Sequence, residues 1–166
     1  MESISTLRVV KIGVVALSYV ALTLIFYLLS YQSVQFRIAE ILMLLCLFSK
    51  DYVIATSIGC FIANVLGPLG AADVIVGTSA TLIAGLCIYL LRNKLNLFTA
   101  SLFPVVLKSV SVAFVLRYSA GKPLFMSMGL VALGEFVCIS VIGVIILHAL
   151  KKKTAFMELL KSDGTK

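Results

Sequence analysis

Long runs of apolar residues, separated by short polar breaks, make up most of this sequence. They occupy six segments, at residues 9–30, 38–49, 53–66, 71–91, 97–117 and 124–150. A helix that crosses a bilayer needs about 20 apolar residues, so the second and third segments are short for a crossing. The breaks between the segments contain Gly, Pro, Asn and charged residues, which suit turns. This pattern predicts an all-α membrane protein in which six helices form one bundle.

The composition requires lipid around these helices. Of the 166 residues, 61% are hydrophobic and only 13% are charged, and a water-soluble domain of this size could not hide so many apolar side chains in one core. A signal peptide is the alternative for the first segment, because Arg8 and Lys11 precede an apolar run. Residues 16–29 continue without a small-residue cleavage site, so we interpret this segment as a retained helix. The four cysteines lie scattered in apolar segments without metal-ligand spacing, as buried free thiols do.

The basic residues divide unevenly between the two ends that alternating crossings define. One end holds Arg8, Lys11, Lys50, Arg92, Lys94, Lys151, Lys152, Lys153, Lys161 and Lys166. The other end holds Arg37, Arg117 and Lys122. Because Lys and Arg accumulate on the cytoplasmic side, we expect both termini in the cytoplasm, with a transmembrane domain at 1–153 and a cytoplasmic tail at 154–166. This asymmetry explains most of the net charge of +7, and no pattern suggests a nucleic-acid surface. The tyrosines, Tyr19 among them, are assigned mostly to the membrane interfaces.

Charged side chains occur within the apolar segments or at their mouths, where an unpaired charge costs about 2.5–3.5 kcal/mol. They are Arg37, Glu40, Asp73, Lys108 and Glu135. One interpretation is a set of structural ion pairs, such as Arg37 with Glu40 or Lys108 with Glu135. Polar groups that converge from separate helices, Asn64 included, fit an outward-facing pocket for a small polar solute better.

Motifs for energy conversion and catalysis are missing from the sequence. Gly121-Lys122 is followed by Pro123, so no phosphate-binding loop of the ATPase type occurs. The sequence also has no zinc-protease motif, no clustered aspartates for a metal and no Ser–His pair in a plausible context. We therefore predict a binding protein without catalytic residues, metal or cofactor, whose energy comes from partners. A membrane enzyme and a structural membrane protein are the alternatives.

Three stretches resemble a known family. They are VQFRIAE at 34–40, IGCFIAN at 58–64 and DVIVGT at 73–78, and the likeness extends to Gly134-Glu135 and Gly143. In these residues the chain resembles the QueT family of substrate-binding S-components of energy-coupling-factor (ECF) transporters, which are assigned to queuosine precursors. The resemblance implies a six-helix S-component in the prokaryotic plasma membrane and a deazaguanine ligand. It also implies a transmembrane T-component and two cytoplasmic ATPases as partners, which would use the ATP. An S-component for another vitamin-like or purine ligand is the alternative.

A deazaguanine sets specific demands on the site that this resemblance implies. Its base presents two adjacent N–H donors, which one carboxylate can accept, and a carbonyl acceptor, which an amide or a cation can satisfy. Glu135 or Glu40 is the candidate for the first role. The candidates for the second role are Asn64, Gln35 and Arg37. Asp73 is a candidate partner for an aminomethyl cation.

Two positions depart from what the family leads us to expect. Lys108 follows Pro104 in the fifth segment, where an amide is expected. Either Lys108 neutralises Glu135 or Asp73, or the ligand is the cyano precursor or queuine. S-components are also thought to meet the T-component through small residues of the first helix. Gly13 and Ala16 are the candidates here, although Gly13-x-x-x-Leu17 differs from the frequent Ala-x-x-x-Ala pattern.

Overall fold

The computed structural model describes residues 6–31 and 34–153, and every regular element within them is helical. The predicted tail at 154–166 lies outside the described residues. In chain order the elements are α1 (Thr6–Ile25), α2 (Tyr27–Ser30), η1 (Ile38–Leu47), α3 (Lys50–Val65), η2 (Asp73–Gly77), α4 (Thr78–Leu91), α5 (Leu97–Ala120), α6 (Leu124–Glu135), η3 (Phe136–Gly143) and α7 (Val144–Lys151). Of these, η1 is a 3₁₀-helix, whereas η2 and η3 are π-helical stretches.

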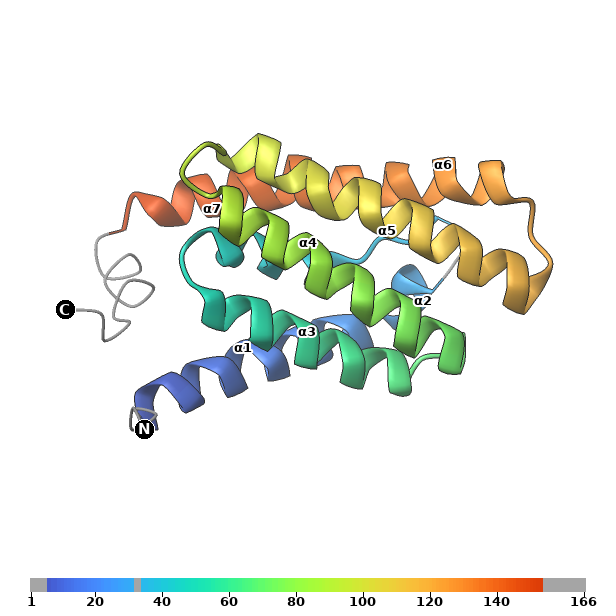
Figure 1. The fold of residues 1–166 in the computed structure, drawn as a ribbon, viewed down its shortest axis with the longest axis horizontal. Coiled ribbons are helices and arrows are strands. Elements are labelled where there is room, and N and C mark those ends of the chain that lie inside the picture. The colour runs from blue at the N-terminus through green and yellow to red at the C-terminus, as the bar shows by residue number, and fades with distance from the viewer. Residues whose placement is uncertain (1–5, 32–33, 154–166) are drawn as a thin grey trace.

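The helices lie along one long axis as an elongated bundle (Figure 1). Helix α1 packs against α3, α3 against α4, α4 against α5, and α5 against α6. The short helix η1 is the central element, because it contacts α1, α3, α4, α5 and η3. A residue on η1 can therefore meet side chains from most of the bundle.

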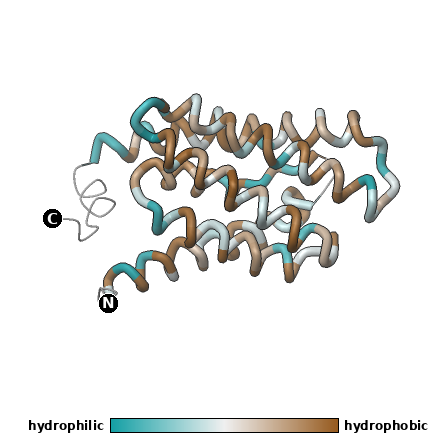
Figure 2. The backbone as a smooth tube through the Cα atoms, in the orientation of Figure 1, coloured by the Kyte–Doolittle hydropathy of each residue, from teal (hydrophilic) through white to brown (hydrophobic). Residues whose placement is uncertain are grey.

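Length and composition separate the helices into two groups. Within residues 6–31 and 34–153, four helices are long and apolar enough to cross a membrane, at Thr6–Ile25, Asp73–Leu91, Leu97–Ala120 and Leu124–Lys151. Helix α3 has 16 residues, about 24 Å at the α-helical rise, and η1 has 10, about 20 Å at the 3₁₀ rise. These are the two segments that looked short in the sequence. Hydrophobic positions cover the helices and hydrophilic ones gather mainly at their ends (Figure 2).

The helix ends follow from ordinary capping chemistry. Ser49 caps α3 by accepting a hydrogen bond from the backbone N–H of Asp51 at 3.2 Å. Asn96 and Thr99 form a reciprocal capping box at the start of α5. Gly121 ends α5 with φ of 63°, a left-handed conformation that glycine adopts without strain. The predicted breaks near 50, 93–96 and 119–123 are thus confirmed.

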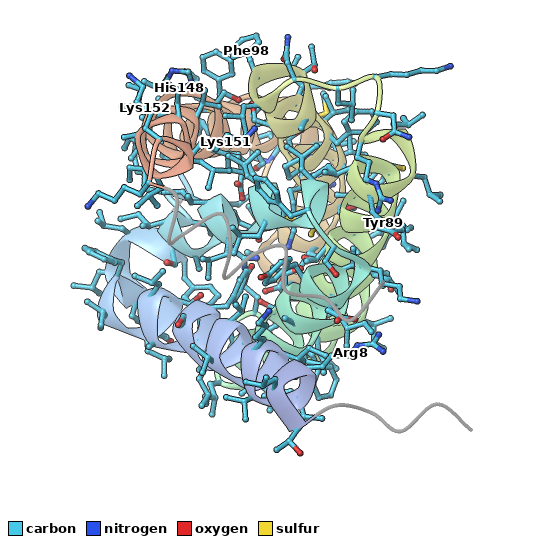
Figure 3. The ribbon with its side chains drawn as sticks, turned by 90° about the vertical axis from the view of Figure 1, so that its left-hand side faces the viewer. Arg8, Tyr89, Phe98, His148, Lys151 and Lys152 are labelled. Atoms are coloured by element: carbon cyan, nitrogen blue, oxygen red, sulfur yellow. The ribbon has the colours of Figure 1, made fainter. Side chains whose placement is uncertain are left out.

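Basic and aromatic side chains gather at one end of the bundle, where α1 begins and α7 ends (Figure 3). Arg8 Nε donates to Asp51 Oδ2 at 2.7 Å and ties α1 to α3 there. The guanidinium of Arg92 lies 4.3 Å from the ring centroid of Tyr89, and Lys151 Nζ lies 5.3 Å from that of Phe48. Among the described residues, Arg8, Arg92 and Lys151 of the predicted basic end lie together there, whereas Arg37, predicted at the opposite end, is buried in the interior.

Two apolar clusters flank the middle of the bundle. The larger one includes Leu44, Tyr52, Ile88, Leu97 and Ile139, from elements that meet toward the basic end. The smaller one consists of Val112, Leu116 and Val131, in the second half of α5 and in α6. Along α5, Lys108 lies between Leu97 of the larger cluster and Val112 of the smaller one, and it is completely buried. A buried charge at this position needs polar partners.

Candidate ligand-binding site

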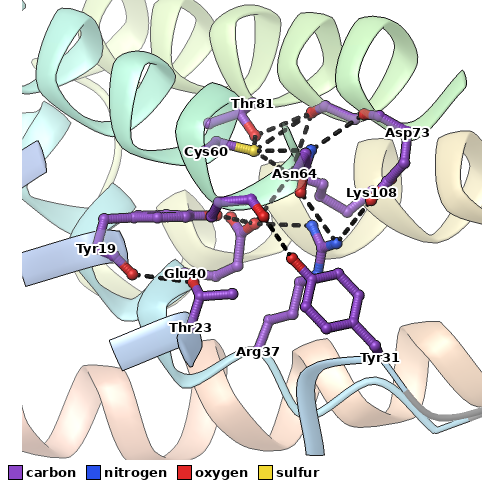
Figure 4. A network of polar contacts seen from close by, with 12 residues as sticks. Tyr19, Thr23, Tyr31, Arg37, Glu40, Cys60, Asn64, Asp73, Thr81 and Lys108 are labelled. Atoms are coloured by element: carbon purple, nitrogen blue, oxygen red, sulfur yellow. Dashed lines mark hydrogen bonds and ion pairs between the residues drawn. The ribbon is translucent and has the colours of Figure 1, made fainter. Parts of the chain in front are cut away.

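Four charged side chains from three separate parts of the chain meet in the interior (Figure 4). Arg37 immediately precedes η1 and Glu40 lies in its first turn, Asp73 opens η2, and Lys108 lies midway along α5. None is more than 2% exposed. The 3₁₀ geometry of η1 explains part of this convergence, because residues three apart share one face, and Arg37 and Glu40 are separated by three positions.

Glu40 is the most heavily partnered carboxylate of the cluster. Its Oε1 accepts a hydrogen bond from the Tyr19 hydroxyl at 2.6 Å and lies 2.9 Å from Lys108 Nζ. The same oxygen lies 3.8 Å from Arg37 Nη1. Two cations and a phenol therefore compensate this buried anion, as a charge removed from water requires.

Arg37 links Glu40 to the second carboxylate, Asp73. Its Nη2 lies 3.2 Å from Asp73 Oδ2 and 3.4 Å from Asn64 Oδ1. The amide of Asn64 also donates to the backbone carbonyl of Asp73 at 3.0 Å, and the guanidinium carbon of Arg37 lies 5.4 Å from the ring centroid of Tyr31. The result is a continuous network from α1 through η1 to the ends of α3 and η2.

The last turn of η2 supplies a second anchor for Lys108. The carbonyl oxygen of Gly77 accepts from Lys108 Nζ at 3.2 Å and from Thr81 Oγ1 at 3.0 Å. Beside it, Cys60 Sγ accepts from Thr81 Oγ1 at 3.1 Å, from Asn64 Nδ2 at 3.4 Å and from Lys108 Nζ at 3.4 Å. Stretches of π-helix leave backbone groups available to side chains in this way, and they occur frequently at functional sites.

Gln35 and Glu135 differ from the rest of the cluster. Both are completely buried, yet neither the amide of Gln35 nor either carboxylate oxygen of Glu135 has a hydrogen-bond partner among the described residues. They are held close together, because the backbone of Gln35 lies directly against Gly134, where a Cβ would overlap the Gln35 carbonyl. The charged neighbours of Glu135 are Glu40, Lys108 and Arg37. Buried polar groups are nearly always hydrogen-bonded, so this pair has the capacity to bind a polar molecule.

The structure brings the predicted site residues into one region. Contacts join Arg37, Glu40, Asn64, Asp73 and Lys108 directly, and Gln35 and Glu135 adjoin them. The suggested neutralisation of Glu135 or Asp73 by Lys108 is wrong, because the ion pair of Lys108 is with Glu40. The suggested pair of Arg37 with Glu40 is present at 3.8 Å. A role of these residues in binding stays a prediction.

Sequence reasoning missed three members of the network, Tyr19, Cys60 and Thr81. The assignment of Tyr19 to a membrane interface is wrong, because the residue is 2% exposed and its hydroxyl contacts Glu40. A signal was available, since a tyrosine well inside an apolar segment needs a partner for its hydroxyl. Cys60 is a buried free thiol as expected, but its contacts with three donors had no sequence signature.

The two candidate docking residues on α1 have different surroundings. Gly13 faces open space, with no atom within 4 Å of a Cβ placed there. Ala16 is only 6% exposed, and its carbonyl lies against Gly59 of α3. Ala16 thus takes part in packing within the chain, while the face around Gly13 is open to a partner or to lipid.

Comparison with known proteins identifies the family. Residues 9–152 match the family described as "QueT transporter". The chain belongs to the QueT transporter family. It is 35% identical over 168 residues to "Queuosine precursor transporter QueT" of Lactococcus lactis subsp. cremoris (strain MG1363), covering 92% of this chain and 97% of that protein. No solved structure matches the chain. The resemblance noted in the sequence is confirmed, and this QueT family member is a multi-pass membrane transporter rather than an enzyme.

Proposed function

We propose that this QueT family protein is the substrate-binding S-component of an ECF importer for a queuosine precursor. It captures a deazaguanine from outside the cell and delivers it to the cytoplasm when a T-component and two ATPases are bound. The name of its relative from Lactococcus lactis supports the ligand class. The lack of a phosphate-binding loop supports a separate source of ATP hydrolysis, and no cofactor is required in this chain.

The unpartnered groups of Gln35 and Glu135 carry this proposal. Together they offer a donor, an acceptor and a carboxylate to a ligand. Both polar atoms of each side chain lack a hydrogen bond, whereas Arg37, Glu40 and Asp73 each have one such atom beside others that are paired. The edge of a deazaguanine presents complementary N–H donors and a carbonyl. If the cluster were only a set of structural ion pairs, these two residues would have no reason to be polar, since an unpartnered buried polar group costs about 1–3 kcal/mol.

The paired residues then act as the frame of the site. Arg37, Glu40, Asp73 and Lys108 bind one another across separate elements, so each is held in one position before a ligand arrives. Such preorganisation reduces the conformational entropy lost on binding. Lys108 does not have to repel a cationic ligand, because Glu40 neutralises it at 2.9 Å. Asn64, which contacts Arg37 and Asp73, completes the frame.

We propose a topology of six crossings with both chain ends in the cytoplasm. Helix α3 and the extended 3₁₀-helix η1 provide the two shorter crossings, in a transmembrane domain that spans 1–153. The basic end of the bundle then faces the cytoplasm, following the positive-inside tendency. The connections at 66–72 and 121–123 face outward, and the face of α1 around Gly13 meets the T-component.

Ligand-binding calorimetry on the purified protein tests the substrate class. The aminomethyl, cyano and queuine forms of deazaguanine would be compared with guanine, riboflavin and biotin. We expect at least one deazaguanine to bind more tightly than the other three compounds. Tight binding of guanine, riboflavin or biotin alone would support an S-component for another purine or vitamin-like ligand. If no deazaguanine bound, the proposed ligand would be wrong.

Co-purification tests the proposed mode of energy coupling. An affinity tag on this chain, expressed in its native host, should retain a T-component and two ATPases in mild detergent. A Gly13→Phe variant should lower the yield of partners without lowering ligand affinity, because position 13 faces open space. A protein that transports ligand in vesicles without partners would contradict the coupling.

A further inference from the structure

The buried positive and negative charges of the site are unequal in number. Two cations, Arg37 and Lys108, accompany three carboxylates, Glu40, Asp73 and Glu135, and all five are buried. Glu40 is paired with both cations, and Asp73 is paired with Arg37. Glu135 has no ion pair within 4.0 Å in the part of the chain that the structure describes, and both its oxygens lack hydrogen bonds. One negative charge is therefore left over when all three acids are ionised.

The cations of the frame are committed to other partners. Lys108 Nζ contacts Glu40 Oε1 at 2.9 Å, the Gly77 carbonyl at 3.2 Å and Cys60 Sγ at 3.4 Å, which uses its three donors. Arg37 pairs with Glu40 and Asp73 and contacts Asn64 and Tyr31, although its Nε has no hydrogen-bond partner among the described residues. Glu40 is itself an anion near Glu135 and repels it. The charge of Glu135 is therefore compensated either by a proton or by a positive charge that a ligand brings.

We infer that Glu135 selects a deazaguanine that carries a protonated amine over the neutral cyano form. This inference rests on the proposed function and adds the chemical form of the ligand. The ammonium group of the ligand would form a buried charge-assisted pair with the carboxylate, which is stronger than a neutral hydrogen bond. Gln35, held beside Glu135 by the contact at Gly134, is then the residue that reads the ring. Its amide has both the donor and the acceptor that an adjacent carbonyl and N–H require.

Calorimetry with two ligands and one substitution tests this assignment. The wild-type protein should bind the aminomethyl form more tightly than the cyano form. The Glu135→Gln variant keeps the shape of the side chain and removes its charge. Its affinity for the aminomethyl form should fall on the order of 100-fold, which corresponds to the loss of one buried charge pair. Its affinity for the cyano form should change several-fold at most. Thermal unfolding of each variant checks that it is folded.

Two further variants complete the experiment. Glu135→Asp retains the charge and should keep the preference for the aminomethyl form. Asp51→Asn removes a carboxylate at the opposite, basic end, where it pairs with Arg8, and should leave both affinities unchanged.

Each contrary outcome has a separate meaning. Equal losses for both ligands in Glu135→Gln would show that Glu135 reads the ring, and no loss for either would show that it does not contact the ligand. Either result, or equal binding of both ligands by the wild type, would overturn the charge selection alone. A wild-type protein that bound no deazaguanine would overturn the proposed function as well.

Discussion

At the scale of single residues, the interior charges form a network in which most members have more than one partner. Glu40 Oε1 has three contacts, from Tyr19, Lys108 and Arg37, and each comes from a different part of the chain. Removing one partner leaves a buried charge uncompensated, which is more costly than removing the pair. Single and paired substitutions should therefore differ clearly in their effects on stability.

Replacement of Lys108 by methionine should destabilise the protein by about 3–5 kcal/mol, because Glu40 loses its nearest cation. The double variant Glu40→Gln/Lys108→Met should be less destabilised than Lys108→Met alone, since the orphaned charge is gone. Thermal unfolding in detergent measures both. Lys94→Met, at an exposed turn, is the control and should unfold like the wild type. A double variant less stable than Lys108→Met alone would contradict a direct ion pair.

Tyr19→Phe removes only a hydroxyl, the donor that contacts Glu40 at 2.6 Å. We expect a loss of about 1.5–3 kcal/mol, the range for hydrogen bonds to a charged group. Tyr118 is 85% exposed, so Tyr118→Phe is a matched control that should leave the melting temperature unchanged. Equal melting temperatures for the two variants would mean that the Tyr19 hydroxyl does not support Glu40.

At the scale of elements, the sequence predicts where helices lie better than what kind of helix each one is. Apolar runs and capping residues place the helix ends near Lys50, Asn96 and Gly121. The pattern of apolar residues does not predict the 3₁₀ geometry of η1 or the π-helical turns of η2 and η3. These geometries differ from an α-helix in the spacing of their backbone hydrogen bonds, not in the choice of apolar residues. The pairing of Lys108 with Glu40 depends on these geometries. For this reason the sequence predicts the charged residues of the site but not their pairing.

The packing of α6 against the segment that carries Gln35 gives a test at this scale. Gly134→Ala would place a Cβ on the Gln35 carbonyl, so the variant should lose both thermal stability and ligand affinity. Gly129 lies on the same helix with nothing within 4 Å of its Cβ position. Gly129→Ala should be neutral or gain up to about 1 kcal/mol from helix propensity. Similar behaviour of the two variants would show that Gly134 has no special contact.

At the scale of the whole molecule, the bundle has two chemically different ends and an apolar surface between them. Side chains such as Leu7, Ile25, Leu90 and Ile145 are at least 64% exposed, which suits contact with lipid. The start of α1, the connection of α4 to α5 and the end of α7 share the basic end (Figure 1). The proposed orientation places that end in the cytoplasm.

Labelling of single cysteines in intact cells checks this orientation. The native cysteines Cys46, Cys60 and Cys138 are buried, so replacing the half-buried Cys87 by alanine gives a silent background. In that background, Ser119→Cys should react with a membrane-impermeant maleimide from outside. Asn93→Cys, at the basic end, should react only after the cells are opened. The reverse pattern would invert the topology and place the site on the inner side.

The π-helical stretch η3 also determines how the last helix would respond to the deletion of a residue. In a π-helix, each backbone hydrogen bond joins residues five apart rather than four, so each turn holds more residues. The segment from Leu124 to Lys151 therefore contains more residues than an α-helix with the same number of turns. Deleting one residue, such as Val137, would let an ordinary α-helix form across the gap. Because the wide turns hold the additional residue, the two halves would keep nearly their present orientation, whereas the same deletion in an α-helical stretch would turn them by about 100° relative to each other. Glu135 and Gly143, which packs against Ile41 and Leu44, would both still face the interior. This stretch should therefore tolerate a one-residue deletion better than the α-helical parts of the same helix.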